Sequence, residues 1–227
     1  MADHVLIIGV GAGIGASLAR RAAAEGARVT LVARSERVTG PLVQQLQADG
    51  VDAAAVVVDA AYEPAFTATL EQVIAERGAP RLVVYNAVDP TPAGPASTLD
   101  PEGLTMALET NVTGAVVVTN AVLEPMRAAG GGTIIFTGGV LATRPFAPMT
   151  SLSIGKAALR SYALCLHQEL GTDDPVHAVT VTIGGMVEPG TAFDPDAIAE
   201  RMFDVHARRD RGRLGEVAYD GPVPAPA

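Results

Sequence analysis

Short, continuously apolar segments recur along the chain and alternate with longer amphipathic or alanine-rich segments. A short apolar run without polar alternation is typical of a strand that is buried on both faces of a sheet. We predict such strands at residues 4–8, 28–33, 56–58, 82–85, 133–137 and 176–183, and a last one at 216–219.

The segments between these strands have helical patterns, and we predict helices over residues 14–25, 41–49, 64–77, from 101, from 151, and over 195–208. Pro41 and Pro101 suit a first helical turn, and Asp100 and either Thr150 or Ser151 suit the N-cap. Alternating strands and helices form a parallel sheet with helices on both faces. The sequence therefore predicts a single α/β domain with a doubly wound parallel sheet of about seven strands over residues 1–220, and a proline-rich tail over 221–227.

Composition narrows the function. The 227 residues are 48% hydrophobic but only 4% aromatic, so the core is built from aliphatic side chains. The net charge of −9 disfavours nucleic acid as a partner, because phosphate binding needs a basic surface. Cys165 is the only cysteine and the four histidines lack ligand spacing, which disfavours a disulfide or a metal site. We see no signal peptide and no membrane-spanning apolar run, and we expect a cytoplasmic protein that acts on a small-molecule substrate.

A glycine-rich turn separates the first predicted strand from the first predicted helix. It contains Gly9, Gly11, Gly13 and Gly15, and the helical pattern begins at Ile14. Glycines let the backbone turn tightly and approach a pyrophosphate, to which a helix N-terminus offers N–H groups and a positive dipole end. The context predicts a dinucleotide-binding loop, the alternative being a tight turn without a ligand.

The end of the second strand indicates which dinucleotide is bound. An acidic residue at this position holds the adenine ribose of NAD, whereas an arginine accommodates the 2′-phosphate of NADP. The chain has Arg34 and no acid at the end of this strand. We therefore expect NADP as the cofactor, with NADPH favoured over NADH, unless Arg34 is an ordinary surface residue.

Two polar residues interrupt apolar helical sequence. Lys156 lies one turn after Leu152 among small and apolar residues, where an ammonium group is costly unless it is paired. Lys156 is either functional or a lysine whose aliphatic stem is buried while its ammonium group reaches solvent. Asn111 stands inside a helical region, where asparagine is unfavourable, so its side chain makes a specific bond or marks a helix bend.

Together these residues resemble the short-chain dehydrogenase/reductase family over nearly the whole chain, which implies a single-domain Rossmann fold. Gly9, Gly13 and Gly15 match the family's glycine loop, and Asp59 matches its adenine contact. Asn86 and Ala87 resemble its Asn-Ala segment, and Gly184–Val187 its turn beside the nicotinamide. Asn111 and Lys156 match the asparagine and lysine of its proton relay. The resemblance implies cofactor contacts also at Gly11, Ile14, Ala60, Gly185, Val187 and Thr191, and through Lys156 itself.

The resemblance breaks at the family's catalytic hydroxyl groups. Leu152 stands where the tyrosine is expected, and Gly139 where the serine is expected. Neither side chain donates a hydrogen bond. Tyr85 and Thr137 are the candidates for a substitute catalytic role, the alternative being that Tyr85 packs the cleft floor. We interpret Met149 as an apolar wall for the substrate.

These observations favour an NADP-dependent oxidoreductase with a degenerate catalytic set. An imine or an activated C=C bond suits such a site better than a simple ketone, whose alkoxide needs a proton donor. A second hypothesis is an NADP(H)-binding regulatory or assembly protein without turnover, and redox-neutral elimination or isomerisation is a third. The segment after Val187 has room for one helix, so we expect an open cleft.

The resemblance also implies a homodimer or homotetramer. Its interface would be formed by the helices that begin near Pro101 and Ser151. On the second helix, four small residues would allow close approach of a partner helix: Gly155, Ala157, Ala158 and Ala163.

Overall fold

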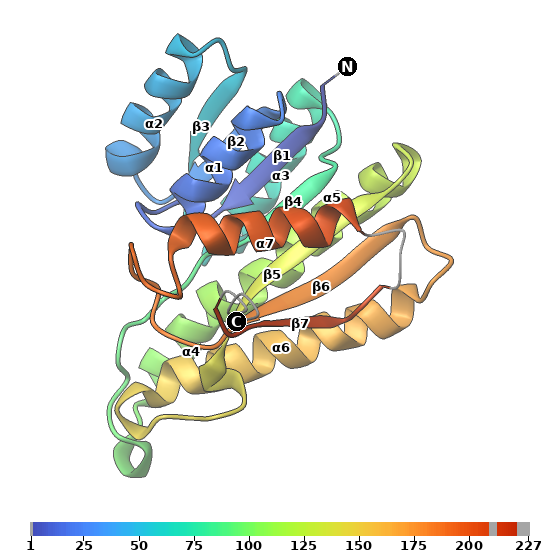
Figure 1. Ribbon diagram of the computed structural model, residues 1–227. Coiled ribbons are helices and arrows are strands. Elements are labelled where there is room, and N and C mark those ends of the chain that lie inside the picture. Colours follow the sequence, from blue (N-terminus) through green and yellow to red (C-terminus); the bar gives the residue numbers. More distant parts are fainter. Residues whose placement is uncertain (1, 209–212, 222–227) are drawn as a thin grey trace, which may run out of the picture.

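The computed structural model describes residues 2–208 and 213–221, and within them seven strands form one parallel sheet (Figure 1). The spatial order is β3-β2-β1-β4-β5-β6-β7. The strands are β1 (His4–Ile8), β2 (Arg28–Ala33), β3 (Ala53–Val57), β4 (Leu82–Tyr85), β5 (Gly132–Gly139), β6 (Val176–Ile183) and β7 (Glu216–Tyr219). This order confirms the predicted doubly wound sheet. The predicted tail lies outside the described residues, except for Gly221.

Helices cover both faces of the sheet (Figure 1). One face packs against α1 (Ile14–Ala24), α2 (Glu36–Ala48) and α7 (Pro195–Ala207). The other packs against α3 (Glu63–Arg77), α5 (Gly114–Ala128) and α6 (Thr150–Leu170). A shorter helix, α4 (Pro101–Leu108), packs against α6, and a π-helical turn (Glu109–Thr113) joins it to α5. Because the crossovers on the two sides of β1 and β4 run to opposite faces, a crevice opens at the carboxyl ends of these strands.

Strand alternation divides the core into two clusters. In β4, Leu82 and Val84 face the α1 side, whereas Val83 and Tyr85 face the α5 side, and all four are fully buried. Burial on both faces explains why the strand is apolar at every position. This alternation also decides which side chains can reach the crevice.

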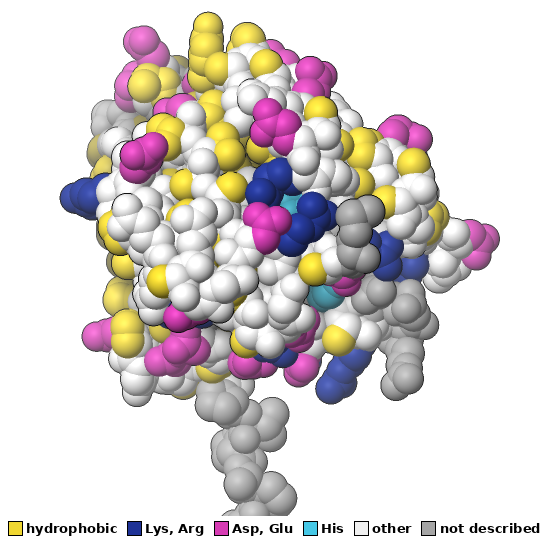
Figure 2. Space-filling view, turned by 90° about the horizontal axis from the view of Figure 1, so that it is seen from above, with side chains coloured by type: hydrophobic (Ala, Val, Ile, Leu, Met, Phe, Trp, Pro, Cys, Tyr) yellow, Lys and Arg dark blue, Asp and Glu magenta, His cyan; other side chains and the backbone are white. Residues whose placement is uncertain are grey.

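The amino-terminal edge of the sheet, opposite the crevice, is held by a polar network. The two ring nitrogens of His4 bond to Gly78 O and Thr30 Oγ1 at 2.8 Å each, and Arg77 donates to the same threonine. Arg77 also pairs with Asp52 at 2.9 Å. Burial lowers the pKa of His4 to about 4, so the ring is neutral. Figure 2 views the molecule from above Figure 1 and shows basic, acidic and histidine side chains gathered on that face.

Several predicted boundaries are wrong. The second helix begins at Glu36, so Pro41 lies inside it, where the missing N–H falls opposite the carbonyl of the exposed Arg37. The helix α6 begins at Thr150 without a side-chain cap. The Thr150 hydroxyl donates to Ala147 O and the Ser151 hydroxyl to Thr91 O, so both are engaged in loop contacts instead.

One helical stretch departs from the sequence expectation about membranes. Residues Pro101–Ala128 are long and apolar enough to cross a membrane, by length and composition alone, with a mean hydropathy of 1.3. Half of that window (50%) is buried inside the protein. Val118, Val122 and Met126 are fully buried in the cluster between α5 and the sheet, so we assign the stretch to the core.

The small residues of α6 are only partly available to a partner helix. Ala163 is fully buried in the core, and Gly155 packs against the Asn111 side chain, where an added Cβ would lie 3.0 Å from it. Ala157 is exposed. The predicted role of Gly155 and Ala163 in an interface is therefore wrong, because both already serve contacts within the chain.

Candidate active site

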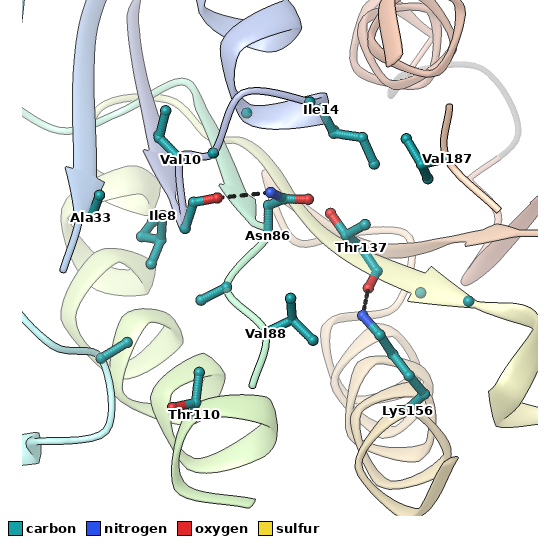
Figure 3. A pocket seen from close by; sticks show the side chains of 18 of the residues that line it. Ile8, Val10, Ile14, Ala33, Asn86, Val88, Thr110, Thr137, Lys156 and Val187 are labelled. Carbon is teal, nitrogen blue, oxygen red and sulfur yellow. Dashed lines mark hydrogen bonds between the residues drawn. The ribbon is translucent and has the colours of Figure 1, made fainter. Parts of the chain in front are cut away.

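A cavity of about 550 Å³ lies at the carboxyl ends of β1, β2, β4 and β5 (Figure 3). Most of the site residues predicted from the sequence line this cavity: Gly9, Gly11, Gly13, Ile14, Gly15, Arg34, Asp59, Ala60, Asn86, Ala87, Thr137, Lys156, Gly185 and Val187. Tyr85, Asn111 and Thr191 do not line it. The fold thus brings the residues of the predicted site together from five loops, strand β5 and helices α1 and α6, which are far apart in the sequence.

The four loop glycines fall into two groups. Gly9 has a φ of +83°, and a Cβ there would overlap the Ala87 backbone, while a Cβ at Gly15 would lie 2.8 Å from Val10 Cα. A Cβ at Gly11 or Gly13 would meet no protein atom within 4 Å. Packing within the chain therefore explains glycine at 9 and 15. Glycine at 11 and 13 instead leaves the cavity floor open, as a dinucleotide requires.

The start of α1 faces this open floor. Gly13 is the N-cap, and the N–H groups of Ile14 and Gly15 have no hydrogen-bond partner among the described residues, whereas Ala16 N–H bonds to Gly11 O and Gly13 O. The side chain of Ile14 points toward the cavity (Figure 3). The helix end therefore offers N–H groups and a positive dipole to an anionic group.

Two charged side chains lie at the outer part of the cavity. Arg34 follows β2, is exposed, and has no carboxylate within 4 Å among the described residues. Asp59 is exposed after β3, and its Oδ1 accepts a hydrogen bond from Ala61 N at 3.0 Å. Arg34 is therefore available to a ligand phosphate.

Asn86 connects the end of β4 to the glycine loop. Its Nδ2 donates to Gly9 O at 2.8 Å (Figure 3). The bond fixes the loop beside Ala87, the residue that Gly9 contacts. Asn86 thus shapes the cavity floor through the backbone.

Lys156 reaches the inner end of the cavity from α6. Its Nζ donates to the backbone oxygen of Thr137 at 2.7 Å (Figure 3). No carboxylate lies within 4 Å of it in the described part of the chain. Burial lowers the pKa of Lys156 to about 8, so the ammonium form dominates below that pH and the neutral amine above it. Leu152, one turn earlier, is buried and lines the same end.

Thr137 is the hydroxyl-bearing residue beside Lys156. Its Oγ1 is buried and has no hydrogen-bond partner among the described residues. Buried hydroxyls are rarely left without a partner. Thr137 lines the cavity, so its hydroxyl can bond to a polar atom of a bound ligand, which supports Thr137 as a site residue.

Asn111 holds a neighbouring loop in place. Its Nδ2 donates to Asp89 O at 3.0 Å and its Oδ1 accepts from Asp89 N at 2.8 Å. It lies in the π-helical turn, so the specific bond and the helix irregularity considered from the sequence occur together. Both polar atoms of the amide are engaged by Asp89, which gives Asn111 a positioning role for the 86–91 loop.

Tyr85 does not reach the cavity. Strand alternation turns it to the α5 side, opposite to the Thr137 side chain, and its hydroxyl donates to Thr110 O at 2.5 Å. Burial raises the pKa of Tyr85 further above its ordinary value. The predicted catalytic role for Tyr85 is therefore contradicted by its direction and by its engaged hydroxyl.

Thr191 and Met149 also lie outside the cavity lining. The Thr191 hydroxyl donates to Glu188 O at 2.8 Å, which folds the segment onto itself. The structure adds Thr110 and an apolar wall that sequence reasoning missed: Val88, Val140, Leu141 and Ile183. No sequence signal separates these residues from ordinary core positions. Among the described residues, no group of three or more His, Cys, Asp or Glu side chains is arranged to hold a metal.

Known proteins share this sequence pattern and this architecture. The sequence pattern of the family described as "short chain dehydrogenase" matches residues 3–196. The chain is 32% identical to the short-chain reductase protein NovJ of Streptomyces niveus, over 87% of this chain and 72% of that protein. It is 30% identical to the 3-oxoacyl-(acyl-carrier-protein) reductase FabG of Pseudomonas aeruginosa, over 93% of this chain and 83% of that protein.

Solved structures share the fold. A metagenomic short-chain oxidoreductase in complex with NADP has a TM-score of 0.87 at 24% identity and covers 97% of each chain. The L-sorbose reductase of Gluconobacter frateurii, complexed with NADPH and L-sorbose, has a TM-score of 0.86 at 24% identity, over 96% of this chain and 95% of that one. With the family match over residues 3–196, this protein belongs to the short-chain dehydrogenase/reductase family.

Proposed function

We propose that the protein is an NADP-dependent oxidoreductase whose catalytic end lacks the family's tyrosine and serine. The observation that carries the proposal is the single cavity described above. It joins a glycine floor, Lys156 and Arg34, which has no ion-pair partner in the described part of the chain, and has Leu152 and Gly139 at its inner end. Membership in a family of oxidoreductases supports the reaction type, and fold relatives bound to NADP or NADPH support the cofactor.

The described residues fit such a cofactor. The start of α1, above Gly11 and Gly13, would hold the pyrophosphate, and Arg34 would pair with the 2′-phosphate. Asp59 and Ala60 would border the adenine. The nicotinamide half would lie between Asn86–Ala87, Lys156 and the turn with Gly185 and Val187, and we propose no contact from Thr191. Bound NADPH supplies a hydride.

The side chains at the inner end of the cavity limit the substrate class, because the two positions of the family's catalytic hydroxyl groups have no hydrogen-bond donor. A simple ketone needs a hydrogen-bonding acid at its developing alkoxide. Leu152 and Gly139 have no such group, and Tyr85 points to the other face of the sheet. An imine, which carries its charge when protonated, or an activated C=C bond does not depend on that hydroxyl pair. We therefore propose one of these two classes as the substrate.

A second candidate function rests on the same substitutions. A chain that kept the dinucleotide floor but lost both hydroxyl groups would bind NADP(H) without turnover and act as a regulatory or assembly protein. Under either function, a homodimer or homotetramer and a cytoplasmic location remain predictions. Light scattering measures the oligomeric state, and substitutions on the exposed Ala157 face of α6 and on α4 test whether these surfaces form the interface.

The experiment combines binding with turnover. Isothermal titration measures NADPH affinity, and NADPH absorbance measures consumption over a panel of imines, enones and ketones. We expect binding, consumption with an imine or an enone, and little consumption with simple ketones. Binding without consumption over the whole panel supports the non-catalytic function. Absence of NADPH binding by folded protein contradicts both.

A further inference from the structure

Lys156 is the only lysine in the chain, whose other cationic side chains, histidine aside, are fifteen arginines. Arginine stays protonated in proteins, whereas a desolvated lysine can release its proton near neutral pH. In every ion pair of the described residues the cation is an arginine. The one lysine ammonium group lies at the inner end of the cavity.

The surroundings leave this ammonium uncompensated. Lysine has three N–H donors, of which one bonds to Thr137 O at 2.7 Å. Burial alone lowers the pKa of Lys156, without a contribution from any charged or titratable side chain of the elements and loop packed around this part of α6. Those side chains are Asp89, Glu102, Glu109, Arg144 and His177. On α6 itself, Arg160 follows Lys156 by one turn and is paired with Glu216. Two N–H donors and one positive charge therefore remain for bound ligands.

The rest of the inner end cannot move a proton in its place. Val88, Val140, Leu141 and Leu152 are apolar, and the Thr137 hydroxyl is a weak acid. A negative charge that develops on a substrate here has one cationic partner, and a positive charge meets a like charge. The sign of the substrate charge therefore decides between the two proposed substrate classes.

We propose that the Lys156 ammonium binds and protonates the substrate oxygen, and that the substrate is an α,β-unsaturated carbonyl compound and not an imine. The proposal rests on the proposed reductase function. When the β-carbon of such a compound accepts the hydride, the C=C electron pair moves onto the carbonyl oxygen as an enolate. A Lys156 N–H bond gives its proton to that oxygen, and the neutral amine regains a proton from water. The enol then becomes the saturated carbonyl product by gaining a proton at the α-carbon from water and losing one at oxygen.

The position of Lys156 fits this substrate better than a simple ketone. In a ketone the oxygen is one bond from the reacting carbon, where the family resemblance places Leu152 and Gly139. In a conjugated carbonyl the oxygen is three bonds from it. Lys156 follows Leu152 by one helical turn. The donor therefore lies further along α6 than the position of the family's tyrosine, and the accepting oxygen of a conjugated carbonyl likewise lies further from the reacting carbon.

The first test reads the ammonium itself and not turnover. Protein labelled with ε-¹³C lysine gives one lysine signal, because the chain has one lysine. The pKa of Lys156 is measured on the NADP⁺-loaded protein with 4-nitrophenol, an oxyanion probe, and with uncharged 4-nitroaniline as the matched control. We expect the phenolate to raise the pKa by about 1 unit or more and the aniline to leave it unchanged. Equal values with both probes would overturn the proposal.

The second test compares cyclohex-2-enone with 2-methyl-1-pyrroline at saturating NADPH. We expect wild type to prefer the enone, with kcat falling about tenfold per pH unit above the pKa of the ammonium. Lys156→Arg should remove this decline, and Lys156→Met should lower kcat for the enone about 100-fold or more relative to kcat for the imine in the same variant. NADPH binding and melting temperature of both variants show that they are folded and loaded.

The outcomes distinguish failure of the proposed Lys156 role from failure of the reductase function. An imine preference in wild type, or equal loss of both substrates in Lys156→Met, overturns the role proposed for Lys156. Failure of wild type to bind NADPH contradicts the reductase function. If NADPH binds but neither compound is reduced, the probe titration alone decides whether Lys156 receives an oxyanion.

Discussion

The two ends of the cavity are built in different ways. The nucleotide end, around Gly11, Gly13 and Arg34, consists mainly of backbone and of space from which side chains are missing. The lysine end, around Thr137, Leu152 and Lys156, consists of side chains whose chemical type and direction decide what can react. The same sheet edge positions both ends.

This difference separates cofactor binding from catalysis. A phosphate site made of N–H groups and glycines depends on backbone geometry, which the fold preserves. A proton donor depends on one atom of one side chain, so a single substitution such as leucine for tyrosine removes it without disturbing the strand or helix that carries it. Similarity of fold therefore supports the nucleotide end more strongly than the lysine end. The variants below test each end separately.

The largest effect is expected at the floor of the nucleotide end. Gly13→Val should abolish NADPH binding, because its side chain would occupy the open space that the pyrophosphate needs. The protein should stay folded, since a Cβ at this position meets no protein atom within 4 Å. Isothermal titration measures the affinity, and circular dichroism melting measures the fold.

Gly9→Val is the matched comparison. Gly9 has a φ of +83° and contacts the Ala87 backbone, so this variant should lose stability and not only binding. Unchanged NADPH affinity in Gly13→Val would contradict the assignment of the nucleotide end.

The next largest effect is expected at the lysine end. Leu152→Tyr with Gly139→Ser should give ketone reduction at least about 100-fold above wild type, because each hydroxyl supplies a donor to the alkoxide. A Cβ at Gly139 would lie 4.0 Å from Lys156 Cε, so the serine has room, and Leu152 already lines the cavity. NADPH oxidation with a small activated ketone measures the gain.

The two single variants are the controls, and each should give less than the pair. Overpacking by the tyrosine ring costs about 1–3 kcal/mol of stability, which thermal melting detects. Vigorous ketone reduction by wild type would show that the proton donor lies elsewhere, and Thr137→Val would then be the variant to measure.

A smaller effect is expected at the rim of the nucleotide end. Arg34→Ala should weaken NADPH binding by about 1–3 kcal/mol, the range for hydrogen bonds to charged groups, and leave NADH binding nearly unchanged. Arg37→Ala, which removes an exposed arginine that does not line the cavity, is the matched control and should change neither affinity. Equal losses of NADPH and NADH affinity in Arg34→Ala would contradict the 2′-phosphate assignment.

The fold was predictable because its signals are local. Apolar runs give the strands, and β1, β2, β4, β6 and β7 begin and end where the pattern places them. Boundaries failed where packing overrides local preference. Alanines 53–55 extend β3 because they pair with β2, and the helix around Pro41 starts earlier despite the proline.

The site was predictable where position in the chain fixes position in space. Residues that directly follow parallel strands meet at one edge, which places the glycine loop, Arg34, Asp59 and Asn86 together. Side-chain direction was not predictable to the same degree. Tyr85 ends its strand beside the crevice, but the parity of the strand turns it away, and the π-helical turn provides the carbonyl that holds its hydroxyl.

The smallest effect is expected at Tyr85, and it tests whether this side chain belongs to the core or to the cavity. Tyr85→Phe should leave NADPH binding and turnover unchanged and lower the free energy of unfolding by about 1 kcal/mol, because Thr110 O loses a buried hydrogen bond. Urea unfolding measures the stability. Tyr62→Phe is the control, since Tyr62 is 64% exposed and a surface change of this kind alters stability by less than about 0.5 kcal/mol. Because the phenylalanine ring fills the same space in the α5 cluster, any loss reports on the hydroxyl alone. A loss of turnover at unchanged stability would mean that the Tyr85 hydroxyl serves the lysine end after all, and that strand parity does not separate the two faces as the structure has it.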